Sequence, residues 1–301
     1  MKCTLRVMSL RPYSIIFCGT SDFAVPSLEA LAADAAFEIQ CVITQPDKPV
    51  GRKQELTPPP VKIAAEKLQV PVFQPDTINT FLPISDSLFP IPDCLLVVSY
   101  GQILSQDILN FPTIAPVNVH ASLLPRFRGA SPIQHAILAG DTESGVTIQS
   151  MVKELDAGPI LAQVKTPLSP RETTLSLHDR LARMGADLLV KTLKASLHPT
   201  AQSTEGITVC RKLTRQDGIV DAATMTAEEI DRKVRALNPW PGVTLTMNGQ
   251  TLKILATELQ ETTGATPIPC KNNTILYVTK LTPAGGKPMM GVEWARGRGN
   301  R

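Results

Sequence analysis

An amide and an imidazole stand two residues apart at the start of the segment NVHASLLPRFRGASPI, which runs from Asn118 to Ile133. The residues before them, APV, are apolar, so Asn118 and His120 fall near the end of an expected strand. Side chains two positions apart in a strand project to the same face. Together they can offer two N–H groups to one oxygen, which suits a carbonyl that becomes an oxyanion during acyl or formyl transfer.

Asp156 is the third group with a place in this chemistry. It lies in KELDAGPIL, where an expected strand gives way to a turn with a glycine, so it too can reach the edge of a sheet. A carboxylate beside an imidazole fixes its tautomer and can guide a proton from an attacking amine. On residue types alone, a structural histidine and a turn-capping aspartate remain open alternatives.

Other catalytic patterns are missing from the sequence. It has no G-x-S-x-G elbow and no Walker-type loop, and its first turn, CGTSDF, has one glycine where a dinucleotide fingerprint has three. The six cysteines are scattered, with no C-x-x-C pair and no histidine at ligand spacing. We therefore expect direct transfer without a covalent intermediate, no metal, and no NAD-dependent redox chemistry.

The order of the apolar runs predicts the frame that carries these residues. Strands and helices alternate along the first part of the chain, which implies right-handed crossovers and a parallel sheet with ligands at its carboxyl edge. We expect an α/β fold with a doubly wound, mostly parallel sheet. The expected strands are 13–19, 37–44, 70–73, 94–99, 115–122, 145–152 and 158–168, and the expected helices are 22–33, 61–68, 131–140 and 173–196.

The tail of the chain has a different character. A helix capped by Thr226, three residues before Glu229, precedes short β-type runs separated by Gly, Asn and Pro, a pattern that predicts a small β-barrel resembling an OB-fold. The polar stretch LHPTAQSTEG before it lacks periodicity and is the best linker candidate. The predicted parts are an N-terminal extension (1–12), a catalytic domain (13–197), a linker (198–210) and a C-terminal domain (211–301).

Composition narrows the class of protein. About 43% of the residues are apolar and no apolar run reaches the roughly 20 residues that cross a bilayer, so we expect a globular protein of the cytoplasm with no membrane contact. The net charge is only +3, yet after Thr204 basic residues outnumber acidic ones 13 to 9. This bias points weakly to a polyanionic partner, and a solvated basic surface is the alternative.

Five motifs carry a resemblance to a known family. GTSDFAVPSLEAL, QPDKPVGR, NVHASLLPRFRGASPIQ, ELDAGPIL and RALNPWPG resemble, in this order, the motifs of the methionyl-tRNA formyltransferases, from Tyr13 to Gly297. The central motif and D-x-G-P are shared with other enzymes that use 10-formyltetrahydrofolate, whereas FAVPSL and NPWPG are more specific. The resemblance implies transfer of the formyl group of 10-formyltetrahydrofolate to the α-amino group of methionyl initiator tRNA.

Alternative readings keep the fold but change the acceptor or the activity. An amino sugar nucleotide is the runner-up acceptor, and glycinamide ribonucleotide or water comes next. The basic tail disfavours glycinamide ribonucleotide, because a small acceptor gives no reason for a second domain of that size. A protein that binds RNA or folate without turnover is a further alternative, which the intact Asn118, His120 and Asp156 set disfavours.

By the resemblance, Asn118 and His120 would stabilise the formyl oxyanion, while Asp156 would orient the imidazole and help to deprotonate the amine. The family's folate site would fall on Ser122, Leu123, Leu124 and Pro125, with pterin contacts from Gln102, Ile103 and Leu104. Its tRNA contacts would fall on Lys48, Arg52 and Lys53 in the loop from Asp47 to Pro60, and on Arg211, Lys212 and Arg215 in the tail. The loop from Asp47 to Pro60 is less basic than is usual in the family, because it carries Gln54 and Glu55. Trp240 is expected to be a packing anchor, and the chain is expected to be a monomer.

Overall fold

The computed structural model describes residues 11–51, 53–81, 90–247 and 249–297. The chain divides into two compact units. Unit 1 holds the chain up to Gly129, with Ser144–Thr166 and His178–Val209, and unit 2 holds Ala130–Glu143, Pro167–Leu177 and the chain from Cys210 onward.

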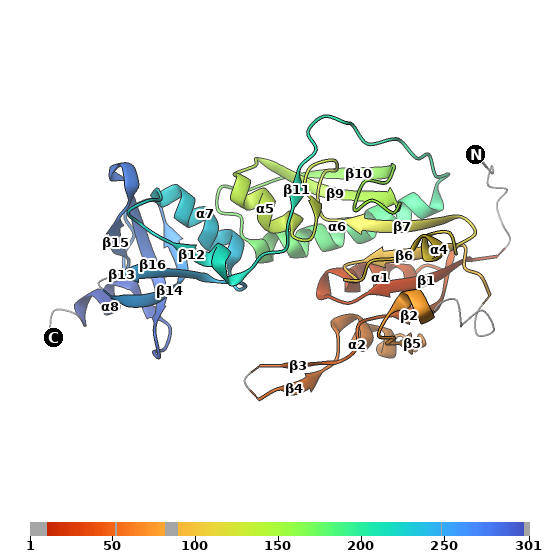
Figure 1. Ribbon diagram of the computed structural model, residues 1–301, viewed down its shortest axis with the longest axis horizontal. Coiled ribbons are helices and arrows are strands. Elements are labelled where there is room, and N and C mark those ends of the chain that lie inside the picture. Colours follow the sequence, from red (N-terminus) through yellow and green to blue (C-terminus); the bar gives the residue numbers. More distant parts are fainter. Residues whose placement is uncertain (1–10, 52, 82–89, 248, 298–301) are drawn as a thin grey trace. The chain divides into compact units, whose positions relative to one another are not determined.

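A seven-stranded sheet forms the centre of unit 1 (Figure 1), in the order β10-β9-β7-β6-β1-β2-β5. The pairs β1–β2, β1–β6, β2–β5 and β6–β7 are parallel, and β7–β9 is antiparallel, so the predicted mostly parallel α/β sheet is confirmed. The strands are β1 (Tyr13–Gly19), β2 (Phe37–Ile43), β5 (Val72–Phe73), β6 (Cys94–Val98), β7 (Ala115–His120), β9 (Glu143–Ser150) and β10 (Ile160–Pro167).

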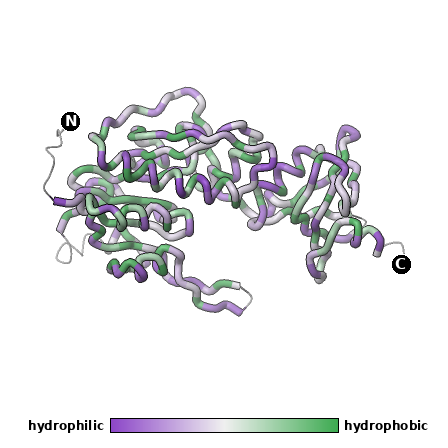
Figure 2. The backbone as a smooth tube through the Cα atoms, turned by 180° about the vertical axis from the view of Figure 1, so that it is seen from behind, coloured by the Kyte–Doolittle hydropathy of each residue, from purple (hydrophilic) through white to green (hydrophobic). Residues whose placement is uncertain are grey.

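The central strands β1 and β6 are mostly apolar because helices and loops cover both faces of a sheet of this kind. All five residues of β6 are buried, and hydrophobic residues run along the central strands in Figure 2. The helices of this part of the chain are η1 (Asp22–Ala24), α1 (Val25–Ala32), α2 (Pro60–Lys67), α3 (Ile78–Phe81), α4 (Gln106–Leu109) and α6 (Thr174–Lys194).

The segment expected to be a loop between Asp47 and Pro60 contains a β-hairpin. Strands β3 (Lys48–Val50) and β4 (Glu55–Thr57) pair antiparallel and are exposed throughout. At its base, Lys62 Nζ donates to both oxygens of Asp47, at 3.0 and 2.8 Å, and this hydrogen bond lowers the pKa of the Asp47 carboxyl. Figure 1 shows the hairpin extending away from the sheet of unit 1.

Unit 2 is built on a six-stranded, mainly antiparallel sheet where the small barrel is predicted. The helix predicted to follow Thr226 is α7 (Ala227–Leu237), and the predicted cap is present, since Thr226 Oγ1 accepts from the Glu229 N–H while the Glu229 carboxylate accepts from the Thr226 N–H. The strands are β12 (Ile219–Val220), β13 (Val243–Met247), β14 (Gln250–Glu258), β15 (Thr266–Pro269), β16 (Ile275–Pro283) and β17 (Met289–Met290), and the last helix is α8 (Gly291–Arg296).

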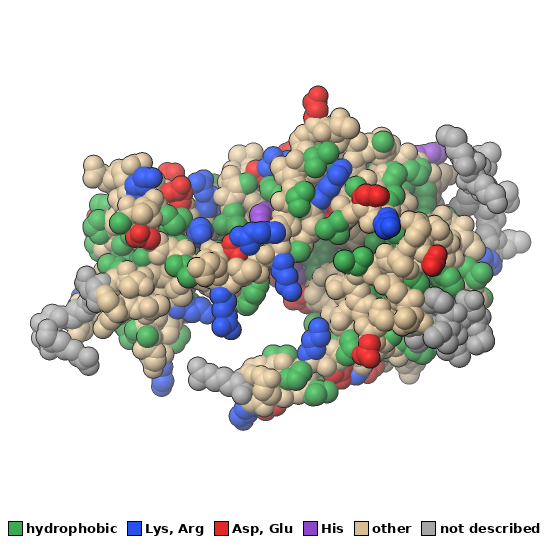
Figure 3. Space-filling model, viewed as in Figure 1, with side chains coloured by type: hydrophobic (Ala, Val, Ile, Leu, Met, Phe, Trp, Pro, Cys, Tyr) green, Lys and Arg blue, Asp and Glu red, His purple; other side chains and the backbone are tan. Residues whose placement is uncertain are grey.

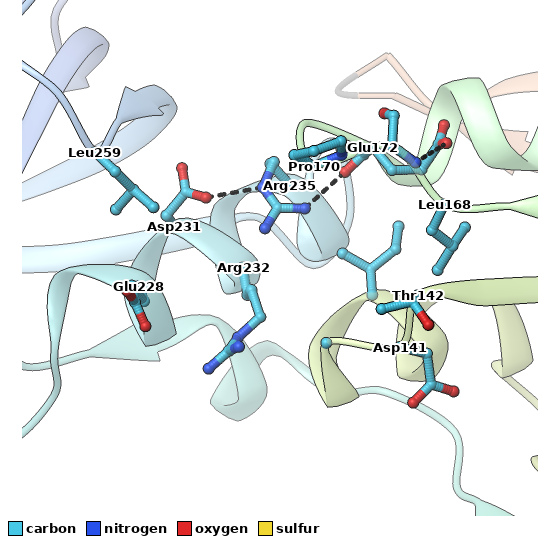
Figure 4. A pocket seen from close by; sticks show the side chains of 13 residues that line it. Asp141, Thr142, Leu168, Pro170, Glu172, Glu228, Asp231, Arg232, Arg235 and Leu259 are labelled. Carbon is cyan, nitrogen blue, oxygen red and sulfur yellow. Dashed lines mark hydrogen bonds and ion pairs between the residues drawn. The ribbon is translucent and has the colours of Figure 1, made fainter.

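Two stretches from earlier in the sequence complete unit 2. Helix α5 (Pro132–Ala139) packs on α7, and residues 167–177 are joined to α7 through a buried carboxylate. Asp231 is 1% exposed, and it accepts from Arg171 Nη1 at 2.9 Å and from Arg235 Nε at 2.8 Å. This network borders a cavity of about 290 Å³ (Figure 4), lined by four acidic side chains and two arginines, none of them among the predicted site residues.

Candidate active site

Unit 1 brings the three predicted catalytic side chains together. Asn118 Nδ2 donates to Asp156 Oδ1 at 3.3 Å, and His120 Nδ1 lies 3.6 Å from Asp156 Oδ2. Asn118 and His120 are 9% and 6% exposed, so the cluster is largely shielded from water. The amide and the imidazole come from β7, and the carboxylate comes from the turn between β9 and β10, as the sequence motifs require.

The two nitrogens of the His120 ring have different roles. Nε2 lies 2.8 Å from the carbonyl oxygen of Phe127. A carbonyl oxygen only accepts, so Nε2 carries the proton and donates it to Phe127. Nδ1 is therefore the ring atom that faces Asp156 and remains available to a substrate.

Asp156 is held by more donors than the sequence predicted. Oδ1 accepts from Gln149 Nε2 at 2.9 Å, and Oδ2 accepts from the Gly129 backbone N–H at 2.8 Å. Asp156 itself has φ +49°, in the left-handed region that a residue with a Cβ occupies only when its surroundings impose it. The carboxylate is thus fixed against His120 by contacts from two other segments.

Gln149 is a member of this cluster that the sequence analysis did not identify. It is 1% exposed in β9, a strand whose central residues are all buried. A buried amide is costly unless it is hydrogen-bonded, so a glutamine two residues from Thr147 on the alternating, half-apolar stretch VTIQ is a weak signal in the sequence. The side-chain amide oxygen of Gln149, Oε1, is buried and has no hydrogen-bond partner among the described residues.

The turn predicted to bind folate is tied to β9 and β10. The Leu124 N–H donates to Thr147 Oγ1 at 3.1 Å, Thr147 Oγ1 donates to the Ser122 carbonyl at 2.7 Å, and Ser122 Oγ donates to the Arg126 carbonyl at 2.6 Å. Ser122 and Leu124 are buried, whereas Leu123 and Pro125 are partly exposed.

A glycine allows the approach of this turn to the sheet. A Cβ at Gly145 would lie 2.1 Å from the Val164 carbonyl oxygen and 2.5 Å from Leu123 Cδ2, both impossible distances. The close approach of Leu123 to β9 and β10 therefore depends on the missing side chain.

The three residues predicted to meet the pterin differ in their surroundings. The Gln102 side chain is occupied within the protein, because Oε1 accepts from the Ile78 N–H and Nε2 donates to the Asp76 carbonyl. Leu104 is 7% exposed and belongs to the core, whereas Ile103 is 86% exposed. Of the three side chains, that of Ile103 is the most exposed.

The residues predicted to bind tRNA are charged and mostly exposed. Lys48 and Lys53 lie in the exposed hairpin segment, and Arg52 falls outside the described residues. Lys212 and Arg215 are exposed, and Arg211 Nη1 donates to Asp217 Oδ2 at 2.9 Å, so Arg211 is already paired. This pair holds the pKa of the Asp217 carboxyl well below its usual range. Figure 3 shows Lys and Arg side chains on the hairpin and on the surface of unit 2.

One further expectation, for Trp240, can be compared with the structure. Trp240 is 53% exposed, so its interpretation as a packing anchor is wrong. Among the described residues there is no group of three or more His, Cys, Asp or Glu side chains placed to hold a metal ion. None of the described helices is long and apolar enough to span a membrane.

Comparisons with known proteins cover nearly the whole chain. Residues 13–193 match the family described as Formyl transferase, and residues 212–299 match the family described as Formyl transferase, C-terminal domain. A methionyl-tRNA formyltransferase from Halorhodospira halophila is 43% identical over 301 residues, which cover 94% of this chain and 96% of that protein. One from Bacillus subtilis is 39% identical over 300 residues, covering 94% of each.

A solved structure has the same fold at low sequence identity. An N-formyltransferase from Helicobacter canadensis, in complex with folinic acid and dTDP-3-aminofucose, matches with a TM-score of 0.66 at 17% identity, over 89% of this chain and 98% of that one.

Proposed function

The chain belongs to the methionyl-tRNA formyltransferase family, and from this premise we propose that it transfers the formyl group of 10-formyltetrahydrofolate to the α-amino group of methionyl initiator tRNA. The observation that carries the proposal is the convergence of Asn118, His120 and Asp156 in unit 1. Relatives with this activity match both parts of the chain, whereas the sugar N-formyltransferases are similar only in fold.

The reaction needs a donor for the developing oxyanion and a path for one proton. The methionyl amine attacks the formyl carbon, a C–N bond forms, and the bond from that carbon to N10 of the folate breaks. The amine loses a proton and N10 gains one, so no external oxidant or reductant is needed. Both atoms that bear charge in the transition state, the formyl oxygen and the amine nitrogen, must lie against the cluster.

Asn118 is placed to donate to the formyl oxygen. One of its two amide N–H groups goes to Asp156, and the other has no acceptor among the described residues. His120 presents Nδ1, because Nε2–H is committed to Phe127. When Nδ1 is protonated, it gives the oxyanion a second donor, and the Asp156 carboxylate stabilises the positive ring.

Asp156 also assists removal of the amine proton. Its two oxygens are held by Gln149, Gly129 and Asn118, which fixes the carboxylate without neutralising it. A fixed carboxylate next to the attacking amine accepts hydrogen-bond donation as the nitrogen becomes cationic. Transfer is therefore direct, and no covalent enzyme intermediate forms.

Two exposed apolar side chains suit a folate. Ile103 and Leu155 are 86% and 67% exposed, which is costly in water and suits the face of a flat ring. We assign the pterin to the main chain of residues 102–104 and the exposed Ile103 side chain. The turn from Ser122 to Pro125 would hold the part of the folate that follows, and no metal is assigned.

The acceptor would be held through phosphates. Lys48, Lys53, Lys212 and Arg215 are exposed and suited to a polyanion, and Arg211 would first have to leave Asp217. In this assignment residues 13–197 carry catalysis and residues 211–301 bind tRNA, and the protein acts as a monomer in the cytoplasm, where charged tRNA is made. The hairpin makes the contact at the acceptor end.

The direct test offers the purified protein 10-formyltetrahydrofolate with each of four acceptors. They are charged initiator tRNA, an amino sugar nucleotide, glycinamide ribonucleotide and buffer. We expect the labelled formyl group on the tRNA, as N-formylmethionine. Label on the sugar nucleotide with none on tRNA would replace the proposed acceptor by the runner-up.

A further inference from the structure

The segment between the sheet of unit 1 and Cys210 is hydrogen-bonded to both catalytic loops. We define the connecting segment as residues 198–208, most of the stretch expected to be a linker. Its first anchor is Thr200, which exchanges backbone hydrogen bonds with Ile160 at 2.7 and 2.8 Å. A free linker would make no such contacts, so the segment has a structural role within unit 1.

The second anchor is Gln202, which uses its whole amide. Nε2 donates to the Asp156 carbonyl at 2.8 Å and to the Gly158 carbonyl at 2.7 Å. Oε1 accepts from Arg128 Nε at 3.0 Å and from Arg128 Nη2 at 2.7 Å. One side chain therefore ties the turn that carries Asp156 to the loop that carries Gly129, the backbone donor to the Asp156 carboxylate.

The turn at residues 156–158, to which Gln202 is hydrogen-bonded, is closely packed against other segments. Asp156 has φ +49°, in the left-handed region, which aspartate tolerates better than most residues with a side chain but which is less favourable than the right-handed region. The turn also lies close against Ser150, because a Cβ at Gly158 would lie 1.7 Å from the Ser150 carbonyl oxygen. Gln202 adds hydrogen bonds to two carbonyls of the same turn, those of Asp156 and Gly158.

The third anchor reaches the histidine. Thr208 Oγ1 accepts from the Phe127 N–H at 2.8 Å, and its carbonyl accepts from the Arg128 N–H at 2.9 Å. The carbonyl of Phe127 is the acceptor of His120 Nε2. The connecting segment thus holds, at Gln202 and Thr208, the two loops that orient Asp156 and His120.

We propose that Gln202 is a positioning residue for the reaction, and that the connecting segment sets the distance between the Asp156 carboxylate and the His120 ring. Gln202 touches neither the reacting carbon nor the proposed nucleophile, and it acts through the turn 156–158. The same segment continues along the chain into Cys210, where unit 2 resumes. This inference rests on the proposed function, because its readout is formyl transfer.

Gln202→Ala and Gln202→Glu test the role in formylation assays on the full chain. Ala removes all four hydrogen bonds, whereas Glu keeps an acceptor for Arg128 and loses the two donors to the carbonyls of Asp156 and Gly158. We expect kcat to fall about tenfold in both variants, with KM for the folate and for the tRNA changed less than twofold. Glu205→Gln is the matched control, since Glu205 is exposed in the same segment and its side chain makes no hydrogen bond to the described residues; its kcat should equal that of the wild type.

The outcomes separate positioning from the other roles. A kcat within twofold of wild type in a folded Gln202→Glu variant overturns the proposal, and so does a raised KM for tRNA at unchanged kcat, which would make the segment a tRNA contact. Full activity of Gln202→Glu beside an impaired Gln202→Ala would assign the effect to Arg128 and contradict the role of the carbonyls. Thermal unfolding of each variant shows which proteins are folded. Formylation by the wild-type protein in the same assay tests the proposed function separately, so a failure of that function is distinguished from a failure of the proposal for Gln202.

Discussion

Replacing Gln149 by leucine separates catalysis from stability at the active site. Gln149 Nε2 gives Asp156 Oδ1 its shorter hydrogen bond, 2.9 Å against 3.3 Å from Asn118. Leucine has a similar size and keeps β9 filled, so the main change is the loss of this donor. Asp156 Oδ1 is then held by Asn118 alone, and the carboxylate can turn away from His120.

The expected magnitude follows from the kind of bond. A hydrogen bond to a charged acceptor contributes about 1.5–3 kcal/mol, and the remaining donors recover part of that, which leaves about 1.5 kcal/mol, or about tenfold in kcat. Stability should change little, because the substitution also removes Gln149 Oε1, which is buried without a hydrogen-bond partner among the described residues. The variant is thus expected to be slow but as stable as the wild type.

Steady-state kinetics with saturating folate and tRNA, together with thermal unfolding, measure both quantities. Gln106→Ala is the control, since Gln106 is exposed on α4 and bonds only to Asn110 among the described residues. A kcat within twofold of wild type would refute the positioning of Asp156 by Gln149. A large loss of stability with unchanged kcat in the folded fraction would make Gln149 a packing residue.

Four other predictions concern the oxyanion donor, the buried network, the acid limit and salt. Asn118→Ala should lower kcat by about 10²–10³, the usual effect of losing an oxyanion donor, and wild-type rates would end that assignment. Asp231→Asn should lower the free energy of unfolding by about 3 kcal/mol, because it leaves Arg171 and Arg235 without their shared buried carboxylate. Chemical denaturation measures this free energy. A change below about 0.5 kcal/mol, the size expected of a surface substitution, would show that the network does not stabilise the fold. The pKa of Asp217 is lowered in the folded protein, so the stabilisation from this carboxylate is complete above its unfolded pKa of about 3.9 and is lost as pH falls through its folded pKa. The melting temperature of the wild type should therefore exceed that of Asp217→Asn at pH 6, and the difference should shrink in strong acid. A difference that stays constant with pH would contradict the ion pair. Binding of tRNA should weaken as salt rises, because several lysines and arginines displace counterions, and salt-independent affinity would exclude phosphate contacts.

Local patterns gave the sheet and the candidate site, because they depend on neighbours in sequence. Asn118 and His120 share a face since they are two apart in a strand, and the cap at Thr226 needs only Glu229 three residues later. The buried strands of unit 1 were predictable because a parallel sheet is apolar on both faces.

Contacts between distant segments were not predictable in this way. Gln149 contacts Asp156 because β9 pairs antiparallel with β7, in a register that places Gln149 opposite Asn118. The register of two paired strands cannot be read from the sequence alone. The expected linker has no hydrophobic period, yet Gln202 bonds to three residues from distant positions. Helix α5 reads as part of the first domain, but its partner α7 lies about a hundred residues later in the chain.

These contacts change how the tRNA-binding role of the tail should be tested. Removal of the chain after residue 197 would take Gln202 from Asp156, so it would disturb the catalytic turn as well, and it would also take α7 from α5. Substitutions at exposed residues such as Lys212 and Arg215 leave both contacts in place. They should raise KM for tRNA without altering folate binding, and an unchanged KM would remove these residues from the tRNA surface.

A double-mutant cycle of Asn118→Ala and Asp156→Asn tests whether the two side chains act together in the same step of formyl transfer. The quantity measured is kcat with both substrates saturating. If they do, the double variant should lose little more activity than the worse single variant, because the first substitution already disables the cluster. Losses that multiply would show that Asn118 and Asp156 act independently, and would contradict a shared site.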